Sequence, residues 1–515
     1  MTRSETLGGR ISHFAYTRSA SNGCRSDMAP PTRLPYDVAR VRIVFAAAEV
    51  APYAKVGGLA DVAGSLPQAL AALGHDVAVY MPLHGSIDRA KFGIPDGGAT
   101  RSVPYGRSTI KVSYPSLVRD RVRTIFVRND QRIGRAKVYG APDDAKRYAA
   151  FARAVAEDLA QARVRPDIVH AHDWHSALLV AMVAGPYRRK LGGAATVFTI
   201  HNLAYQGHSK ADILDLAGLP KRRLKVEAAG QLNPMARAIA AADIVSTVSE
   251  RYAEEILTPE FGAGLHALLG ERKADLWGIV NGIDTDVFDP ATDRHIPARY
   301  SAADPRGKVN DKAALQKELG LAINARTPLF GVIGRLVEQK GIDILTPVAP
   351  EILRTGAQIA VLGTGEPAYE AIWKELAAKH PGTLSLTLGF DAALAQRIYA
   401  GADMFLMPSR FEPCGLGQLI SFRYGTVPVV RSVGGLADTV RDADADPRRG
   451  TGFSFGDYTS DALLDAVRRG LHAYRDEPRW AALVERVMKL DHSWAASARR
   501  YVEMYEAARV ARRAA

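Results

Sequence analysis

The sequence contains very little cysteine and no long apolar run. Its 515 residues include only two cysteines, Cys24 and Cys414. Two cysteines cannot form a disulfide framework, and such scarcity is typical of proteins from a reducing cytosol. No stretch reaches the roughly 18 consecutive apolar residues of a membrane-spanning helix. We therefore expect a cytoplasmic protein with no membrane partner.

Recognisable nucleic-acid-binding motifs are also missing. The formal charge of +12 comes from arginines spread along the chain, and it suits small anionic ligands such as nucleotide phosphates. Without a nucleic-acid motif, small phosphorylated ligands are favoured over nucleic acid. The length, set against about 150 residues per domain, predicts two or more domains.

Residues 1–40 show no periodic pattern and are rich in Arg, Ser and Pro, with few acids. This composition fits either a transit peptide or an extended start in which Met28 is the true initiator. No apolar segment of a secretion signal is present. We favour a disordered N-terminal extension on a bacterial protein.

Strands and helices alternate from Val41 onward. Alternation of this kind predicts an α/β fold with parallel, doubly wound sheets. The pattern restarts after the turn-rich N-G-I-D stretch at 281–284, which indicates a second domain. We predict an N-terminal Rossmann-like domain over 41–280, a second over 281–492, and a long C-terminal helix within 493–515. Strands are expected at 41–46, 76–81, 124–127, 167–170, 196–200, 243–248, 328–334, 358–362, 383–388, 403–407 and 427–430.

The stretch 403–426 has the form of a buried strand, a sharp turn and a helix that begins near Gly415. Its turn holds Glu412, Cys414 and Gly417. Helix N-termini and glycines favour phosphate binding, and a carboxylate can accept hydrogen bonds from sugar hydroxyls. A nucleotide-sugar site is the functional interpretation, and an ordinary strand-to-helix turn is the structural one.

A five-residue segment occurs twice, as G-G-L-A-D at 57–61 and again at 434–438. Each copy is a glycine pair that opens a helix. Ligands bind at the carboxyl ends of the strands in sheets of this type. We therefore expect both glycine loops to line one cleft between the domains.

Histidines gather at the ends of two predicted strands. The cluster H-A-H-D-W-H at 170–175 matches no zinc-binding spacing. A polar ligand site, a structural role and a metal site remain alternatives, and Asp173 is expected to cap the helix that follows. His201 and Asn202 end the next strand, where they can bind hydroxyl groups or be structural.

Arg335 and Lys340 lie on one loop after a predicted strand and could clamp a diphosphate. The alternative is a solvated basic loop. Phe390 could stack on a base or belong to the core. The D-x-D string at 284–286 is interpreted as a linker, and the acidic stretch 442–446 as a solvated loop.

Seven of these segments together resemble the bacterial glycogen synthase and plant starch synthase family, in the right order from Val41 nearly to the C-terminus. They are K-V-G-G-L-A-D-V at 55–62, H-A-H-D-W-H at 170–175, H-N-L-A-Y-Q-G at 201–207, N-G-I-D at 281–284, R-L-V-E-Q-K-G at 335–341, S-R-F-E-P-C-G-L at 409–416 and G-G-L-A-D-T-V at 434–440.

The resemblance implies a GT-B fold, in which two Rossmann-like domains face each other and the C-terminal helix returns to the first. It implies transfer of glucose from ADP-glucose to the non-reducing end of an α-1,4-glucan such as glycogen, with retention and with no metal or cofactor. The implied catalytic residues are Glu412, His201, Asp173, Arg335 and Lys340, and the implied donor-binding residues are Lys55, Gly57, Gly58, Asp61, Asn281, Phe390, Cys414, Gly415, Leu416 and Gly417.

Three departures from the family pattern bear on substrates. Phe390 stands where the family usually has Tyr, Gly417 where it usually has Thr, and the segment 129–146 is shorter than is common. A related glucosyltransferase that uses UDP-glucose, or a small acceptor such as glucose-1-phosphate, is therefore an alternative. An inactive glucan-binding protein is a further alternative, but none of Lys55, His201, Arg335, Lys340 and Glu412 is lost.

Overall fold

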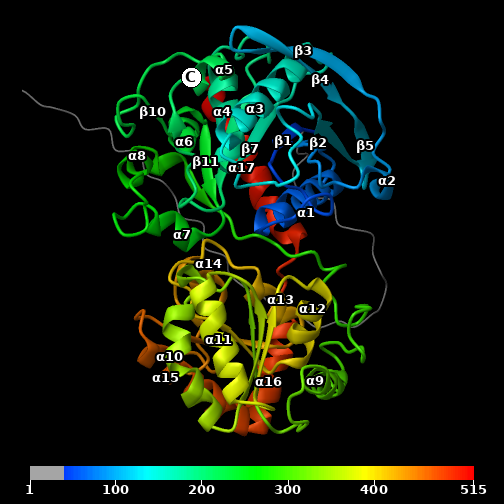
Figure 1. The fold of residues 1–515 in the computed structure, drawn as a ribbon, viewed down its shortest axis with the longest axis vertical. Coiled ribbons are helices and arrows are strands. Elements are labelled where there is room, and N and C mark those ends of the chain that lie inside the picture. Colours follow the sequence, from blue (N-terminus) through cyan, green and yellow to red (C-terminus); the bar gives the residue numbers. More distant parts are fainter. Residues whose placement is uncertain (1–39, 515) are drawn as a thin grey trace, which may run out of the picture. The chain divides into compact units, whose positions relative to one another are not determined.

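The computed structural model describes residues 40–514, so the extension predicted for residues 1–40 lies outside it except for Arg40. Two separate β-sheets, each covered by helices, form the described part (Figure 1). We call the part built on the sheet nearer the N-terminus the first lobe and the other the second lobe. Among the described residues, no helix is both long and apolar enough to cross a membrane.

The first sheet has eight strands, and all neighbouring pairs are parallel except β5 with β6. Its central strands are buried along nearly their whole length because helices cover both faces. The order reverses between β1 and β7, so the loops after these two strands diverge and leave a crevice. In spatial order the strands are β12 (Leu276–Gly278), β11 (Ile244–Thr247), β8 (Ala195–Ile200), β7 (Ile168–His172), β1 (Arg42–Ala46), β2 (Asp76–Pro82), β6 (Val122–Val127) and β5 (Ser116–Arg119).

The helices of the first lobe pack on this sheet through three apolar clusters, one with α1 and the C-terminal helix, one with α3, α4 and α5, and one with α4, α6, α7 and α8. Two small antiparallel pairs, β3 (Ala99–Tyr105) with β4 (Ser108–Tyr114) and β9 (Ser209–Lys210) with β10 (Gln231–Leu232), stand apart from it. The helices are α1 (Gly58–Ala72), α2 (Arg89–Phe92), α3 (Asp144–Gln161), α4 (Asp173–Ala184), α5 (Ile213–Ala217), α6 (Pro234–Ala241), α7 (Glu250–Glu255), α8 (His266–Glu271) and the short 3-10 helix η1 (Lys273–Asp275).

The second sheet has six strands, all parallel. Their order is that of a dinucleotide-binding fold, with the reversal between β13 and β16. The loops after these two strands carry the predicted Arg335–Lys340 and Glu412–Gly417 segments. In spatial order the strands are β15 (Leu384–Leu388), β14 (Gln358–Gly363), β13 (Leu329–Ile333), β16 (Met404–Met407), β17 (Val427–Arg431) and β18 (Phe453–Phe455).

Three helices of the second lobe were not predicted from the sequence: α9 (Gly307–Glu318), α15 (Ser460–Arg475) and α16 (Glu477–Met488). Helix α9 has little apolar periodicity because its buried positions include Asp311, Lys312 and Gln316. The other helices of this lobe are η2 (Glu338–Lys340), α10 (Ile342–Arg354), α11 (Pro367–Lys379), α12 (Ala392–Gly401), α13 (Gly417–Arg423) and α14 (Gly434–Thr439).

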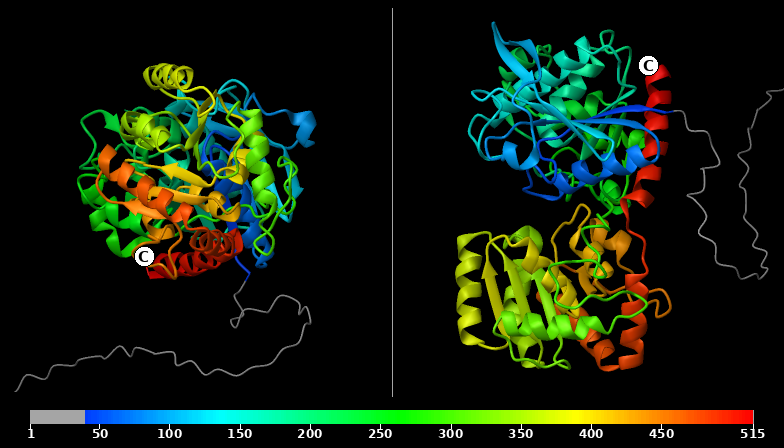
Figure 2. Two further views of the ribbon diagram at one scale, coloured as in Figure 1. Left: turned by 90° about the horizontal axis from the view of Figure 1, so that it is seen from below. Right: turned by 90° about the vertical axis from the view of Figure 1, so that its right-hand side faces the viewer.

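The C-terminal helix α17 (Trp494–Ala514) returns to the first lobe, as predicted, and lies against α1 and β8 (Figure 2). Near its end, the buried Arg512 guanidinium pairs with the Asp243 carboxylate at 2.7 Å and donates to the Thr196 hydroxyl. Where the chain crosses between the lobes, the Ile283 N–H donates to the His492 carbonyl at 2.8 Å. The two crossing segments therefore support each other.

Helix α7 of the first lobe touches the second lobe directly. The Ser249 hydroxyl donates to the Pro413 carbonyl at 2.6 Å, and the buried Glu255 carboxylate accepts from the Gly434 N–H at 3.1 Å. Ser249 also caps α7 by accepting from the Tyr252 N–H, as the sequence predicted. Both contacts lie directly behind the turn that carries Glu412.

One buried ion pair joins α9 to the second sheet. The Lys312 ammonium donates to the Asp403 carboxylate at 2.7 Å, to the Ala325 carbonyl and to the Tyr474 hydroxyl. Asp403 in turn accepts from the Leu329 N–H at the start of β13. Lys312 is 3% exposed and Asp403 8%, so neither charge has water as an alternative partner.

We expect Lys312→Met to lower the free energy of unfolding by about 3–5 kcal/mol, because it leaves the Asp403 carboxylate buried and unpaired. Urea denaturation of both proteins measures the difference. Arg306→Ala, which removes an exposed ion pair with Asp304, is the matched control and should leave stability unchanged. Equal stability of Lys312→Met and the control would contradict this account.

Candidate functional site

A cavity of about 1320 Å³ lies between the carboxyl ends of the two sheets. Its walls include the loops after β1, β7 and β8 of the first lobe and those after β13 and β16 of the second. Twelve of the predicted site residues line it: Gly57, Gly58, Asp173, His201, Asn281, Arg335, Lys340, Glu412, Cys414, Gly415, Leu416 and Gly417.

Three predicted donor-binding residues are not among the described lining residues. The Lys55 ammonium and the Asp61 carboxylate form an ion pair at 2.6 Å beside the Gly57–Gly58 loop. Phe390, which the sequence left open between base stacking and core packing, is 84% exposed. The core interpretation of Phe390 is therefore wrong.

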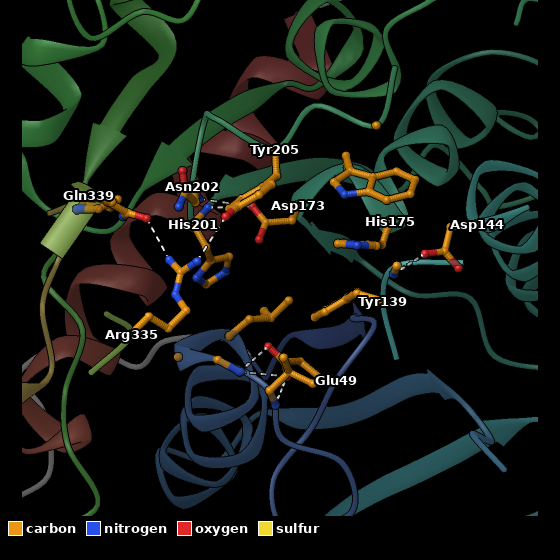
Figure 3. A pocket seen from close by; sticks show the side chains of 18 of the residues that line it. Glu49, Tyr139, Asp144, Asp173, His175, His201, Asn202, Tyr205, Arg335 and Gln339 are labelled. Carbon is orange, nitrogen blue, oxygen red and sulfur yellow. Dashed lines mark hydrogen bonds between the residues drawn. The ribbon is translucent and has the colours of Figure 1, made fainter. Parts of the chain in front are cut away.

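The two histidine segments come together at the ends of β7 and β8 (Figure 3). A ring nitrogen of His172 lies 3.0 Å from one of His201, and His170 contacts the Tyr505 hydroxyl of α17 at 2.9 Å. His170 and His172 are fully buried, so they are structural, whereas His201 lines the cavity. Burial lowers the pKa of His201 to about 3, which keeps the ring neutral at physiological pH.

Asp173 does not cap α4, and that prediction is wrong. It has φ of +54°, and its carboxylate accepts the His201 N–H at 2.8 Å, with no side-chain cap on the helix. Burial raises the pKa of Asp173 to about 7, and the nearby Glu49 carboxylate adds to the shift. A left-handed backbone at an aspartate is uncommon and is found mostly at functional sites.

The loop after β13 presents two cations to the cavity. The Arg335 guanidinium donates to the Tyr205 hydroxyl of the first lobe at 3.3 Å and to the Gln339 amide oxygen at 2.7 Å. The Lys340 ammonium donates to the Glu412 carboxylate at 2.6 Å. Gly341 closes the loop with φ of +75°, and a Cβ there would lie 2.0 Å from the Pro408 carbonyl oxygen. Only glycine therefore permits this approach of the two loops.

The turn after β16 is held from within the second lobe. The buried Glu412 carboxylate accepts from both Lys340 and the Ser409 hydroxyl. Burial raises the pKa of Cys414 to about 12, so this thiol is not a nucleophile at neutral pH. A Cβ at Gly417 would lie 2.8 Å from the Phe405 ring. The threonine that the family resemblance led us to expect would therefore displace Phe405 here.

The second G-G-L-A-D copy does not line the cavity, so the expectation of two matching ligand loops is wrong. Gly434 and Gly435 pack on the backbone of the active-site turn, where Cβ atoms would lie about 2 Å from the Glu412 and Cys414 carbonyl oxygens. The Gly434 N–H is taken by Glu255 of the first lobe. This copy holds the turn and joins the lobes.

The acidic stretch 442–446 is exposed at Asp444 and Ala445, as the solvated-loop interpretation expected, but its aspartates also form ion pairs. The Asp442 and Asp444 carboxylates both pair with Arg469 of α15, at 2.8 and 3.1 Å. Asp442 also accepts from the Ser454 N–H of β18. Asp442 and Asp444 therefore fasten α15 to the edge of the second sheet, whereas Asp446 pairs with Arg449 of its own loop.

Several cavity residues were missed by the sequence analysis: Glu49, Tyr139, Trp174, His175, Tyr205, Gln339 and Tyr399. The Tyr139 and Trp174 rings lie 4.5 and 4.1 Å from that of His175 and form an aromatic wall (Figure 3). Trp174 and His175 belong to the H-A-H-D-W-H cluster, so their proximity to Asp173 was a usable signal. Nothing in the sequence marked Glu49 or Tyr139.

The residues described here contain no group of three or more His, Cys, Asp and Glu side chains that could hold a metal ion. Four basic side chains line the cavity, Arg335 and Lys340 from the second lobe and Lys146 and Lys210 from the first, and Lys55 lies just outside it. The two cations of the second lobe, facing a neutral histidine and a buried aspartate, suit an anionic ligand that also carries hydroxyl groups.

Comparison with known proteins agrees with this geometry. A family model described as starch synthase catalytic domain matches residues 42–271, and one described as glycosyl transferases group 1 matches residues 327–473. A glycogen synthase of Anaeromyxobacter sp. (strain Fw109-5) is 47% identical over 475 residues, which are 90% of this chain and 99% of the relative. Glycogen synthase 2 of Geobacter sulfurreducens is 43% identical over 92% of this chain and 100% of its own.

Among solved structures, the catalytic domain of starch synthase IV from Arabidopsis thaliana, bound to ADP and acarbose, superposes with a TM-score of 0.86. It is 35% identical and covers 92% of this chain and 100% of its own. Sucrose-phosphate synthase from Thermosynechococcus elongatus, at 19% identity and a TM-score of 0.58, shares the fold. The predicted GT-B fold is thus confirmed, and the chain belongs to the glycogen synthase and starch synthase family of glycosyltransferases.

Proposed function

We propose that this protein is a glycogen synthase that transfers glucose from ADP-glucose to the non-reducing end of an α-1,4-glucan, with retention of the anomeric configuration. One observation carries the proposal: Arg335 and Lys340 of one lobe face His201 and Asp173 of the other across a single cavity. The volume of about 1320 Å³ leaves room for a nucleotide-sugar together with acceptor sugars. The names of the relatives support the same activity.

In this proposal the two cations bind the diphosphate and neutralise the charge that grows on the leaving ADP. The hydrogen bond between Lys340 and Glu412 fixes the ammonium at the cavity wall before a donor arrives. Glu412, His201 and Asp173 bind the hydroxyl groups of the transferred glucose. The backbone from Cys414 to Gly417 receives phosphate, with Lys55, Asp61, Gly57, Gly58 and Asn281 around the donor and Phe390 near the base.

The contacts of the carboxylates in the site agree with a retaining reaction in which no protein side chain is the nucleophile. One oxygen of Glu412 accepts hydrogen bonds from both Lys340 and Ser409, and pairing with the ammonium makes this carboxylate a weaker nucleophile; one oxygen of Asp173 accepts the His201 N–H. The acceptor hydroxyl would attack on the face that the diphosphate leaves, and its proton would pass to a phosphate oxygen of the departing ADP. The protein contributes positioning and charge stabilisation.

Two further expectations from the sequence belong to the same proposal. We place the division between the domains near residue 280, with the C-terminal helix beginning near residue 493, and we propose a cytoplasmic enzyme in a bacterium.

An acceptor of glucan type is favoured by the aromatic wall of Tyr139, Trp174 and His175, because flat rings pack well against sugar faces.

The deciding experiment is glucose incorporation into glycogen, run in parallel with ADP-glucose and UDP-glucose in the presence of EDTA. We expect strong incorporation from ADP-glucose alone. Incorporation mainly from UDP-glucose would keep the site and change the donor. Binding of ADP without incorporation would indicate a different acceptor, such as glucose-1-phosphate, or an inactive glucan-binding protein.

Lys340→Ala should reduce kcat by about 100- to 1000-fold, the usual loss when one preorganised charge-stabilising group is removed. Its melting temperature should fall by no more than a few degrees, because Glu412 lines the cavity, where water can replace the ammonium, and keeps its bond to Ser409. Steady-state kinetics and thermal denaturation measure both effects. Lys379→Ala, which removes an exposed pair with Glu375, is the control. A large loss of stability with little change in kcat would make Lys340 structural.

The stability of Asp173→Asn relative to that of the wild type should increase as pH rises. Because the folded-state pKa of Asp173 is about 7 and the unfolded value is about 3.9, the folded protein holds a proton that the unfolded chain has released. This contribution is full below about pH 4 and is lost as pH rises through 7. The melting temperature of the variant minus that of wild type should therefore be larger at pH 8 than at pH 5.

The matched control for this pH series is Asp167→Asn. The Arg42 guanidinium helps to hold the pKa of Asp167 below its usual range, against the opposing effect of burial. Asp167 is therefore ionised in both states from pH 5 to 8, and its variant should show a constant deficit over that range. A constant difference for Asp173→Asn as well would show that its carboxylate titrates normally.

A further inference from the structure

Glu49 is a buried carboxylate in the cavity wall that the proposed reaction does not use. It follows β1 and is 2% exposed. Its oxygens accept the Val56 N–H and, at 3.1 Å, the Gly57 N–H (Figure 3). These two N–H groups belong to the loop between Lys55 and Gly58, which opens α1. One carboxylate thus determines the backbone course of the whole loop.

The bonds to Glu49 decide what the loop can offer a ligand. The Val56 and Gly57 N–H groups are already taken, so they are not donors for a phosphate. A bare carboxylate this close to a diphosphate would repel it, and the two N–H groups disperse that charge. The loop is left with the Lys55 ammonium and the backbone at Gly58 as its ligand-facing groups. Glu49 therefore acts on the donor through the loop and does not touch it.

Glu49 also faces the opposite side of the cavity. The Tyr139 side chain lies beside the Glu49 carboxylate in the cavity wall (Figure 3). The Tyr139 ring lies 4.5 Å from that of His175 and is part of the aromatic wall. Residues 139–146 continue along the cavity from this point. Glu49 is therefore the link between the glycine loop and the wall on which we expect an acceptor sugar to pack.

We propose that Glu49 is a positioning residue that holds the 55–58 loop in its donor-binding shape and, through Tyr139, couples donor binding to occupancy of the acceptor side. The coupling rests on the function proposed above. A sugar chain on the aromatic wall fixes Tyr139, Tyr139 fixes Glu49, and the loop is then ordered before the donor arrives. If binding of one ligand orders the loop, the second ligand binds more tightly. The two ligands raise each other's affinity by the same factor.

A nucleophilic role for Glu49 does not fit its surroundings. A carboxylate nucleophile needs a free oxygen at the sugar carbon, whereas both Glu49 oxygens accept hydrogen bonds from the loop. The charged and titratable groups that face it are Tyr139, Asp61 and Asp173. None of these is a cation that could bind the carboxylate and draw it away from its hydrogen bonds with the loop.

The first test is Glu49→Gln, which replaces one acceptor oxygen by an NH₂ group that faces backbone N–H donors. We expect the KM for ADP-glucose and the Kd for ADP, measured by calorimetry, to rise about tenfold, with kcat changed less than threefold. Glu49→Asp moves the carboxylate away from the loop by one methylene, so KM and Kd should rise in the same way but by a smaller factor. This variant also provides the test if Glu49→Gln does not fold.

Glu227→Gln is the matched control, because Glu227 is a buried carboxylate that accepts the Leu224 and Asn233 N–H groups away from the cavity. It should lower the melting temperature and leave KM and Kd unchanged. If Glu49→Gln also changes only the melting temperature, Glu49 is structural and the proposal is wrong. ADP binding is measured without turnover. An inactive wild type would therefore refute the proposed function, while the effect of Glu49→Gln on the Kd for ADP would still test the role of Glu49.

The second test addresses the coupling. We expect maltoheptaose to tighten ADP binding to the wild type by about fivefold, within the usual range of coupling between sites. Tyr139→Phe keeps the ring on His175 and removes the hydroxyl from Glu49, so it should bring this factor close to one. An unchanged factor in Tyr139→Phe, or no effect of maltoheptaose on wild type, would overturn the coupling.

Discussion

The contact between helix α7 and the glycine pair Gly434–Gly435 is the constraint on which the site depends. Ser249 binds the Pro413 carbonyl within the turn that carries Glu412 and Cys414, and Glu255 binds the N–H of Gly434, which packs on that turn. Because these partners are main-chain atoms and the contact is buried, the first lobe fixes the position of this cavity-lining turn of the second. A change in the angle between the lobes must therefore move this turn. Closure of the lobes would act on the proposed reaction through that movement.

Charge is divided between the two lobes in a way that suits a phosphorylated sugar. The second lobe contributes Arg335 and Lys340, while the first contributes the neutral His201 and two carboxylates whose pKa is raised to about 7, Glu49 and Asp173. Burial causes each of these shifts, and it costs stability in the folded state. Groups that are strained or poorly solvated without a ligand are common where a ligand later provides the missing partners.

Much of the fold was predictable because local patterns and global packing agree. All predicted strands are present, and Ser249 caps its helix as expected. The misses have physical reasons. Helix α9 buries Lys312 and Asp311 and so lacks an apolar stripe. Asp442 and Asp444 look like a solvated loop until α15 supplies Arg469. Asp173 stands at the start of a helix, where the sequence suggests a cap, yet its carboxylate turns to the neighbouring strand end.

The two largely parallel sheets, the family, and the clustering of Arg335, Lys340, Glu412 and His201 at strand ends can all be read from the amino-acid order. They follow from short-range patterns and from the rule that parallel strands end at one edge. The difference between the two G-G-L-A-D copies, one lining the cavity and the other joining the lobes, is visible only in three dimensions. Only the tertiary structure likewise revealed Glu49 and Tyr139, because partners 90 residues apart leave no periodic trace in a single sequence.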